Sequence, residues 1–467
     1  MSVKHPVLEV LNGGPVKPAP VVPNYALSCA NFPPGLFVRR RMCDLWYQRA
    51  QRAGSEKSIS FEEALEVSVQ AVAEILDEVM PPPCCLSASG ALLLPSRQAV
   101  SSSRISLIVD GFVWQTAGGA KLLAGCRGPD GLWKDQPLNH PVTAPGRYEQ
   151  DLALMQDVAR KYKGGRAPGS SHHQSYKSGC FDLARALKDH YGKDIVLCAH
   201  KQPPLPRCYV HLRDGLGVGY ERGVGYDSLL VALLQEQDLM RELLELFLPH
   251  AAEGWEVLRD QVGVEIIFLD EFMSGADVIS PSLYRDLIAP YTKRAFEFFN
   301  GLGFKTVLVH GGSALPVLDV LKEIPWHGLL VEESRKNYQN DIGQVRRKLG
   351  TNRALFGNVD MQLLEEGSDQ ALLAEVRRQI DAAGRDAPFI VACGSPLTAA
   401  TTADRLRLFC DSTRILESGQ EGYPEFACDR SSRRPRRFVR QAGDGQKPVF
   451  SKKTGFSMRP AAPDMGT

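Results

Sequence analysis

The sequence has almost no net charge and no long apolar run. Its 55 Lys and Arg residues balance 54 Asp and Glu residues, which leaves a formal net charge of +1. This balance gives no electrostatic argument for nucleic acid or an anionic membrane as a partner, and it favours a small molecule. No apolar run approaches the roughly 18 residues of a membrane-spanning helix, and the N-terminus lacks a charged segment followed by an apolar one. We therefore expect a cytoplasmic protein that does not enter the membrane.

Paired cysteine motifs and dinucleotide-binding motifs are also missing. The 11 cysteines are an odd number without paired short spacings, so reduced thiols are expected instead of a disulfide framework. No G-x-G-x-x-G opens a helical segment, which weakens a dinucleotide-binding interpretation. At 467 residues, the chain is long enough for one large domain with additions, or for two domains.

What the chain does contain is a regular alternation of strand and helix patterns between residues 194 and 416. Continuous apolar character in the predicted strands is typical of a parallel sheet that is buried on both faces. These strands are predicted at 194–200, 265–271, 305–310, 328–333, 354–360 and 388–394. The helices between them are predicted at 227–248, 280–300, 339–349, 369–383 and 402–417. Repeated units of this kind predict an α/β fold, a (β/α)8 barrel, in preference to an open sheet.

The first 190 residues are less regular. A helix is predicted over 60–80, behind Ser60 as its N-cap. The Pro-, Ser- and Gly-rich stretches 81–104 and 163–178 are predicted as loops, and His172 is expected to be exposed in the second of them. The predicted division is an N-terminal part with loop insertions (1–190), the main barrel part of the same domain (191–418) and a basic, disordered tail (419–467).

Candidate functional residues follow from the barrel, because chemistry is placed at the carboxyl ends of barrel strands. The residues at these ends are His200, Asp270, Glu271, His310, Glu332, Glu333, Asn358, Asp360 and Cys393. Asp270 and Glu271 are predicted as a general acid and its partner, with capping or ion pairing to Lys293 and Arg294 as the alternative. Tyr291 is a third catalytic candidate, with packing as its alternative role.

Several segments resemble one known family. They are VLEVLNGGPVKPAPVVP (7–23), VDGFVWQTAGG (109–119), the long segment 268–312 with ISP and PYTKR, LFGNVDMQLLEEGS (355–368) and CGSPLTAATTADRLRLF (393–409). The chain resembles the uroporphyrinogen decarboxylase (URO-D) superfamily, and within it the corrinoid-dependent methyltransferase branch. The resemblance implies a TIM barrel of the uroporphyrinogen decarboxylase/methionine synthase type with an irregular N-terminal extension.

Departures from the family patterns separate its branches. Decarboxylases carry an arginine-rich segment that grips the acid groups of the substrate, and here Asn24, Tyr25 and Ala26 stand in that place. The methyltransferase branch binds zinc through an H-x-C motif and a later cysteine. His310 and Cys393 match two of these ligands, whereas Gly312 stands where the middle cysteine is expected.

Related methionine synthases add a glutamate from an intervening strand, and Glu332 or Glu333 occupies that place here. Only one of the two can face the barrel mouth, because side chains alternate along a strand, and we favour Glu333. The resemblance thus implies a Zn²⁺ site formed by His310, Glu333 and Cys393. The alternative for His310 is an ordinary strand terminus, and for Cys393 a small buried residue.

Three functions remain open at this point. The resemblance implies a methyltransferase that moves a methyl group between a small-molecule donor or a thiol acceptor and cobalamin, carried by a small corrinoid-binding partner protein. Zinc would hold a substrate thiol as its thiolate. The first alternative is uroporphyrinogen decarboxylation in porphyrin biosynthesis. The second is a diverged barrel protein without catalytic activity, which Gly312 makes credible.

Overall fold

The structure is a computed structural model that describes residues 5–23, 33–54, 56–127, 133, 147–165, 171–214, 223–250, 253–335 and 337–419. The chain divides into two units, Met1–Gln420 and Glu421–Thr467. The predicted basic tail lies outside the described residues apart from its first position.

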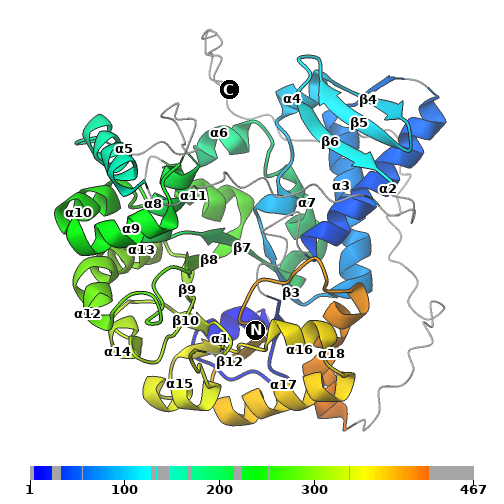
Figure 1. The fold of residues 1–467 in the computed structure, drawn as a ribbon. Helices are drawn as coiled ribbons and strands as arrows, with labels where there is room; N and C mark the ends of the chain where they lie inside the picture. Colours follow the sequence, from blue (N-terminus) through cyan, green and yellow to red (C-terminus); the bar gives the residue numbers. More distant parts are fainter. Residues whose placement is uncertain are drawn as a thin grey trace. The chain divides into compact units, whose positions relative to one another are not determined.

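Eight parallel strands form a nearly closed barrel with helices around it (Figure 1). The strands are β1 (Val21–Val22), β3 (Cys84–Ser87), β7 (Ile195–Lys201), β8 (Val264–Glu271), β9 (Lys305–His310), β10 (Gly328–Val331), β11 (Ala354–Phe356) and β12 (Phe389–Ala392). They pair in the order β1-β12-β11-β10-β9-β8-β7-β3, and the two end strands β1 and β3 lie close together. The predicted (β/α)8 barrel is confirmed.

The helices follow the strands along the chain. The longer ones are α2 (Gly35–Ala53), α3 (Phe61–Val79), α5 (Tyr148–Lys161), α7 (Asp182–Tyr191), α8 (Pro204–Arg213), α9 (Tyr226–Gln235), α10 (Gln237–Leu246), α13 (Ala289–Gly301), α15 (Ile342–Leu349), α17 (Asp369–Ala383) and α18 (Ala403–Ser418). The short ones are α1 (Pro6–Leu11), η1 (Gly90–Leu92), α4 (Arg97–Ser101), α6 (His172–Lys177), η2 (Gly192–Asp194), α11 (Trp255–Val257), η4 (Leu258–Val262), α12 (Pro281–Leu283), η5 (Tyr284–Ile288), α14 (Leu318–Leu321) and α16 (Met361–Glu366). None of the described helices is both long and apolar enough to cross a bilayer.

Two segments that the sequence predicted as loops contain regular structure. Strand β3 lies within 81–104, where only four residues pair with β7, so the local sequence carries too short a signal. Helix α6 lies within 163–178 and is capped by the side chain of Ser171. The prediction that His172 is exposed was wrong, because its ring packs against Trp255 with ring centroids 4.5 Å apart.

The predicted helix 227–248 is also divided. It forms α9 and α10, which are separated at Glu236, where φ is −121° and ψ is 47°. The predicted helix 60–80 is confirmed as α3, and the Ser60 hydroxyl accepts the hydrogen bond of the Glu63 amide.

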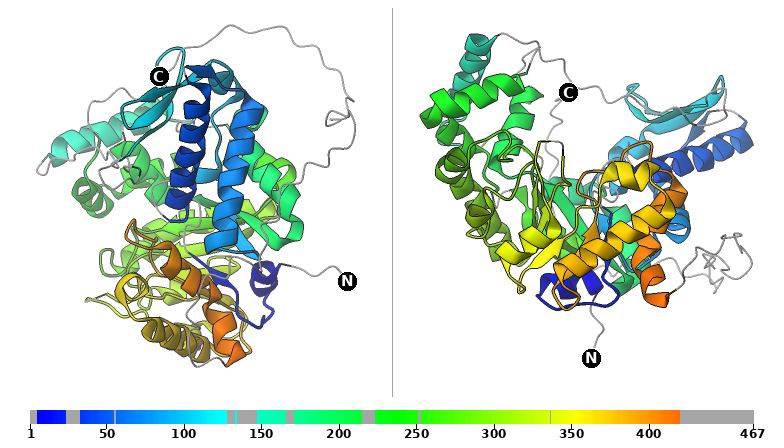
Figure 2. Two further views of the ribbon diagram at one scale, coloured as in Figure 1. Left: turned by 90° about the vertical axis from the view of Figure 1, so that its right-hand side faces the viewer. Right: turned by 60° about the horizontal axis from the view of Figure 1, so that its bottom comes forward.

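An antiparallel sheet extends the N-terminal part beside helices α2 and α3, which pack against each other (Figure 2). It contains β2 (Lys57–Ser58), β4 (Ser103–Ile108), β5 (Gly111–Thr116) and β6 (Lys121–Cys126), in the order β2-β4-β5-β6. Trp114 of β5 is buried against Trp46 of α2, with ring centroids 5.0 Å apart. The segment 109–119, which carries part of the family resemblance, therefore builds the core of this sheet.

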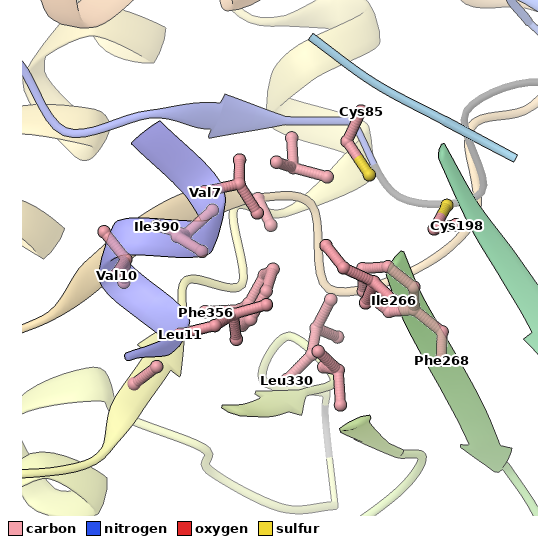
Figure 3. Close-up of a cluster of buried hydrophobic side chains, with 14 of the residues drawn as sticks. Val7, Val10, Leu11, Cys85, Cys198, Ile266, Phe268, Leu330, Phe356 and Ile390 are labelled. Atoms are coloured by element: carbon pink, nitrogen blue, oxygen red, sulfur yellow. The ribbon is translucent and has the colours of Figure 1, made fainter. Parts of the chain in front are cut away.

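The barrel interior is filled with apolar side chains, and helix α1 contributes to it (Figure 3). Val7, Val10 and Leu11 of α1 belong to the same buried cluster as Ile266, Phe268, Val307, Val309, Leu330 and Phe356 of the strands. Because side chains alternate along a strand, this cluster shows which residues face the barrel axis. Phe268 and Val309 face the interior, so Glu271 and His310 face the surrounding helices.

Candidate functional site at the carboxyl ends of the barrel strands

A pocket with a volume of about 650 Å³ opens beyond the carboxyl ends of strands β8 to β11. Phe272 and Met273 line it after β8, Gly311 and Gly312 after β9, and Glu332 after β10. Its other polar lining residues are Asp277, Ser334, Arg335, Asn337, Tyr338, Asp360 and Gln362. The pocket therefore lies where a (β/α)8 barrel places its chemistry.

The charges that line the pocket are mainly negative. Within the described part of the chain, three carboxylates, those of Asp277, Glu332 and Asp360, line the pocket together with one guanidinium, that of Arg335. Arg335 Nη2 lies 3.1 Å from Glu332 Oε1 and 2.6 Å from Glu333 Oε1, so neighbouring acids already balance its charge. Burial and the charge of Glu332 raise the pKa of Tyr338, whose hydroxyl stays protonated. The pocket offers little attraction to an anionic ligand.

The loop after β9 is held by side chains that accept hydrogen bonds from its amides. The amide of Gly312 donates to Glu332 Oε2 at 2.6 Å, and the amide of Ser313 donates to Asp277 Oδ1 at 2.7 Å. The amide of Ala314 donates to Asn340 Oδ1 at 3.0 Å. Two pocket acids therefore also fix the backbone that forms the pocket wall.

Gly312 occupies a position that disfavours any side chain. Its φ is +76°, in the left-handed region, and an added Cβ would lie 2.4 Å from Asp277 Oδ1 and 2.8 Å from Gly275 Cα. The second of these contacts is with backbone, which cannot move aside easily. The cysteine that the methyltransferase branch carries here cannot be accommodated without rearrangement of this loop.

His310 does not point into the pocket. It is the last residue of β9 and lies on the outer face of that strand, paired in register with Glu271 and Val331. Its ring packs against the Tyr284 ring, with centroids 6.1 Å apart, on the side covered by helices. The side chain is fully buried, and neither ring nitrogen has a hydrogen-bond partner among the described residues. Burial lowers the pKa of His310 to about 4, against smaller opposing effects of Ser313, Asp277 and Glu332.

The two adjacent glutamates after β10 exchange their expected positions. Glu332 lines the pocket, whereas Glu333 is buried behind it and accepts hydrogen bonds from the Ser395 hydroxyl at 2.8 and 2.9 Å. Burial raises the pKa of Glu333, although Ser395 and Arg335 oppose the shift. Cys393, fully buried, follows Ala392, a residue of the interior cluster, and so lies on the outer face of its strand. The structure places Glu332 in the pocket lining in place of the favoured Glu333; both residues follow the end of β10 at Val331, so strand alternation does not fix their directions.

The placement of these side chains can be compared with what a zinc ion requires. No three His, Cys, Asp or Glu side chains within the described part of the chain are grouped closely enough to hold a metal ion. The structure does not bring His310, Glu333 and Cys393 together at the mouth, and Gly312 leaves no room for the missing thiolate. The residues present do not fit a zinc centre of the expected kind.

The three predicted catalytic residues, Asp270, Glu271 and Tyr291, do not lie together in one site. Asp270 faces the barrel interior and Glu271 faces outward, because adjacent residues of a strand point to opposite faces. Glu271 accepts hydrogen bonds from the hydroxyls of Ser274 and Thr292, both at 2.6 Å, and burial raises its pKa. It ties β8 to α13 and does not line the pocket. Tyr291 lies on α13 with its ring 5.8 Å from the Arg294 guanidinium, which agrees with a packing role.

The partner of Asp270 is a residue that the sequence placed at a strand end without assigning it a role. His200, near the end of β7, has its Nδ1 3.5 Å from Asp270 Oδ1. Its ring stacks on Phe268, with centroids 4.7 Å apart and an interplanar angle of 11°. The signal that could have found this pair is the shared location of His200 and Asp270 at the carboxyl ends of neighbouring strands.

Comparison with known proteins agrees with this geometry. Residues 221–415 match the family model for uroporphyrinogen decarboxylase (URO-D), and this segment contains strands β8 to β12 and the pocket. This segment is similar to the uroporphyrinogen decarboxylase superfamily, the family that the sequence motifs resemble. No curated protein sequence matches it significantly.

One solved structure shares the fold of this chain. A methyltransferase from Methanosarcina mazei aligns with a TM-score of 0.52 and 15% identity, over 89% of this chain and 98% of that one. At this identity the likeness shows a shared fold only. A B12-independent methionine synthase from Shewanella sp. W3-18-1 aligns over 86% of this chain and 96% of that one, with 12% identity and a TM-score of 0.28, too low to carry an argument.

Proposed function

We propose that this protein transfers a methyl group between a small molecule and a corrinoid carried by a partner protein, at the pocket beyond β8 to β11. The observation that carries the proposal is the negative lining of this pocket. It separates methyl transfer from the decarboxylation of uroporphyrinogen, which is the activity that gives the family its name.

The negative lining opposes a substrate with many acid groups. Eight carboxylates placed beside Asp277, Glu332 and Asp360 would repel them, since unscreened like charges about 4 Å apart cost several kcal/mol near a protein surface. Arg335, the one cationic residue among the described residues of the lining, is engaged by Glu332 and Glu333. The positions where decarboxylases carry their arginine-rich segment hold Asn24, Tyr25 and Ala26, which lie outside the described residues.

The pocket rim supports docking of a large partially apolar group. Phe272 and Val278 line the pocket and are 45% and 49% exposed, and such apolar side chains at the edge of a concave site commonly contact a ligand or partner. A bound corrinoid supplies the cobalt that accepts or donates the methyl group. Phe272 and Val278 are the residues we assign to its contact surface.

The role of the acids is to select the methyl donor. With Glu332 and Asp277 fixed by the amides of Gly312 and Ser313, their charges stay in place and favour donors that are neutral or cationic. A donor with a carboxylate or sulfonate near its methyl group is disfavoured by the same charges. The proposal is therefore methyl transfer from a donor without negative charge, in either direction.

The test is a methyl-transfer assay with purified protein and chemically reduced cobalamin. A neutral aryl methyl ether, a neutral methyl thioether, a quaternary methylammonium compound and a methoxybenzoate are offered in turn, and methylcobalamin is quantified. We expect transfer from at least one neutral or cationic donor and none from the anionic one. Absence of transfer from every donor, or conversion of uroporphyrinogen to coproporphyrinogen, would overturn the proposal.

A matched pair of variants tests the rim. Phe272→Asp is expected to reduce methyl transfer about tenfold, which corresponds to about 1.4 kcal/mol of lost transition-state binding. Leu93→Asp replaces an apolar side chain that is 42% exposed and does not line the pocket, and it is expected to leave the rate unchanged. Equal effects of the two substitutions would contradict the assignment of Phe272.

A further inference from the structure

We infer that His200 is the proton-transferring catalytic residue of this site and that Asp270 is the positioning residue that orients its ring. The inference rests on the proposed methyl transfer and deepens it, since it names the group that protonates the leaving atom of the donor.

The barrel brings the two residues to one face at the carboxyl ends of neighbouring strands. His200 of β7 pairs in register with Phe268 of β8, and Asp270 follows two residues later on the same face. This face is the barrel interior, because Phe268 belongs to the interior cluster. Two residues beyond Asp270, Phe272 lines the pocket. The pair therefore lies inside the barrel mouth, next to the strand end that forms the pocket wall.

Phe268 and Asp270 both help to hold the His200 ring in one orientation. The stacked Phe268 ring fixes the plane of the His200 ring. The Asp270 carboxylate lies 3.5 Å from His200 Nδ1 and so fixes which edge of the His200 ring faces β8. Both side chains are only 8% exposed. A carboxylate at Nδ1 favours the proton on that nitrogen and stabilises the imidazolium, so that Nε2 is the atom that exchanges a proton with substrate. Contacts of this kind often shorten when substrate binds.

The other titratable groups near His200 do not substitute for it. Cys198 lies two residues earlier on the same face, and burial, a hydrogen bond to Cys85 and the charge of Asp270 raise the pKa of its thiol, which stays neutral. Lys201 points to the other face, with Nζ 5.0 Å from the centre of the Trp255 ring, and burial lowers its pKa to about 8. Of these three side chains of β7, His200 is therefore the one that we assign to proton exchange at the inner face.

The reaction balances with this assignment. The bond between the methyl carbon and the leaving oxygen or sulfur breaks, and its electron pair stays on the leaving atom, which takes a proton from protonated His200. The methyl group passes to cobalt(I), whose electron pair forms the new bond, so that cobalt is formally oxidised to cobalt(III). In the reverse direction, His200 accepts the proton of the hydroxyl or thiol that receives the methyl group.

The experiment compares two donors that differ in their need for protonation. Phenyl methyl ether releases phenolate, which is a poor leaving group unless it is protonated. Dinitrophenyl methyl ether releases dinitrophenolate, which is stable as an anion. His200→Asn is expected to slow single-turnover transfer from phenyl methyl ether by about 10² to 10⁴, the usual contribution of a general acid, with substrate affinity nearly unchanged. With dinitrophenyl methyl ether, the loss is expected to fall below about tenfold. Asp270→Asn should also slow transfer from phenyl methyl ether more than transfer from dinitrophenyl methyl ether, and its loss of rate should be smaller than that of His200→Asn.

Two controls separate chemistry from folding. His200→Gln tests whether a second neutral amide side chain causes the same donor-dependent loss of rate as His200→Asn. The unfolding midpoint of each variant shows whether that variant is folded. His327→Asn changes a histidine whose Nδ1 accepts from the Thr306 amide at the opposite end of the barrel, and it should transfer methyl from both donors at the parent rate. An equal loss of rate for both donors in His200→Asn overturns the inference alone. Absence of transfer by the parent protein overturns the proposed function and the inference with it.

Discussion

Gly312 determines what the loop after β9 can hold. Its left-handed backbone and its contact with Asp277 and Gly275 explain why glycine stands where the methyltransferase branch has a cysteine. A sequence comparison alone treats this glycine as a lost ligand. In the structure it is a residue required by the local backbone, and Asp277 occupies the space that a thiolate would need.

Restoring the cysteine should therefore destabilise the protein without creating a metal site. Gly312→Cys is expected to lower the free energy of unfolding by about 3 kcal/mol, the upper end of the usual cost of a strained left-handed residue. Urea unfolding and metal analysis after zinc addition measure the two effects. Gly119→Cys, at φ +83° with no atom within 4 Å of an added Cβ, is the control and should cost about 1 kcal/mol. Stoichiometric zinc binding by Gly312→Cys alone would contradict the prediction.

Glu271 should make stability depend on pH. Burial raises its pKa in the folded protein above the ordinary value of 4.5, so between these two values the folded state binds more protons than the unfolded state. The free energy of unfolding therefore falls as pH rises through this window and is level above it. Glu271→Gln should remove this slope and be more stable than the parent at neutral pH.

Urea unfolding between pH 4 and pH 8 measures this difference. Glu366→Gln changes an exposed glutamate of α16 and serves as the control, with a curve expected to run parallel to that of the parent. A Glu271→Gln curve that also runs parallel to the parent would show that Glu271 does not titrate in this window.

At the scale of elements, the pocket depends on how the loops after neighbouring strands are tied together. Asn340 is buried and makes three hydrogen bonds with its side chain. Its Nδ2 donates to the carbonyls of Gly312 and Glu332, both at 2.9 Å, and its Oδ1 accepts from the amide of Ala314. Asn358, after β11, donates to the Asn340 carbonyl at 2.7 Å and extends the connection. One side chain thus joins the loops that follow β9 and β10.

Asn340→Ala should loosen this wall of the pocket. The Ala314 amide and the Gly312 carbonyl would lose their bonds to Asn340, whereas the Glu332 carbonyl would keep the bond from Asn358, and a loss of about 2 kcal/mol in unfolding free energy is expected. Hydrogen exchange of the amides of residues 311–314 should become faster. Asn300→Ala removes hydrogen bonds to Pro325 and Thr306 at the opposite end of β9, and it should lower stability without changing that exchange. Unchanged exchange at 311–314 in Asn340→Ala would refute the tying role.

The elements themselves follow closely from local sequence. Ser60 caps α3 as its position before an amphipathic run predicts, and the strands β8 and β9 match the apolar runs at 265–271 and 305–310. Strand β3 could not be predicted, because four residues between Pro-rich and Ser-rich stretches carry no periodic signal. Its existence depends on pairing with β7, which lies more than a hundred residues away in the sequence.

At the scale of the whole molecule, the barrel unit ends where its last helix ends. Helix α18 stops at Ser418 and is capped by Gly419 with φ +66°, and residues 421–467 form a separate unit. A chain that ends at Gln420 should therefore unfold at the same midpoint temperature as the full chain. Differential scanning calorimetry of both chains measures this. A clear decrease of the midpoint in the shorter chain would show that residues after Gln420 contribute to the stability of the barrel.

The sequence by itself determined the type of barrel, the family that residues 221–415 resemble and the strand ends at which functional residues gather. Buried strands and capped helices leave local patterns, and a barrel places all strand ends at one mouth. The tertiary structure decided which of these residues face one another. It turned His310, Glu271 and Glu333 away from the mouth, placed Glu332 in the pocket and paired Asp270 with His200. The physical reason is that the inward or outward phase of each strand is set by its pairing with distant strands around the barrel axis.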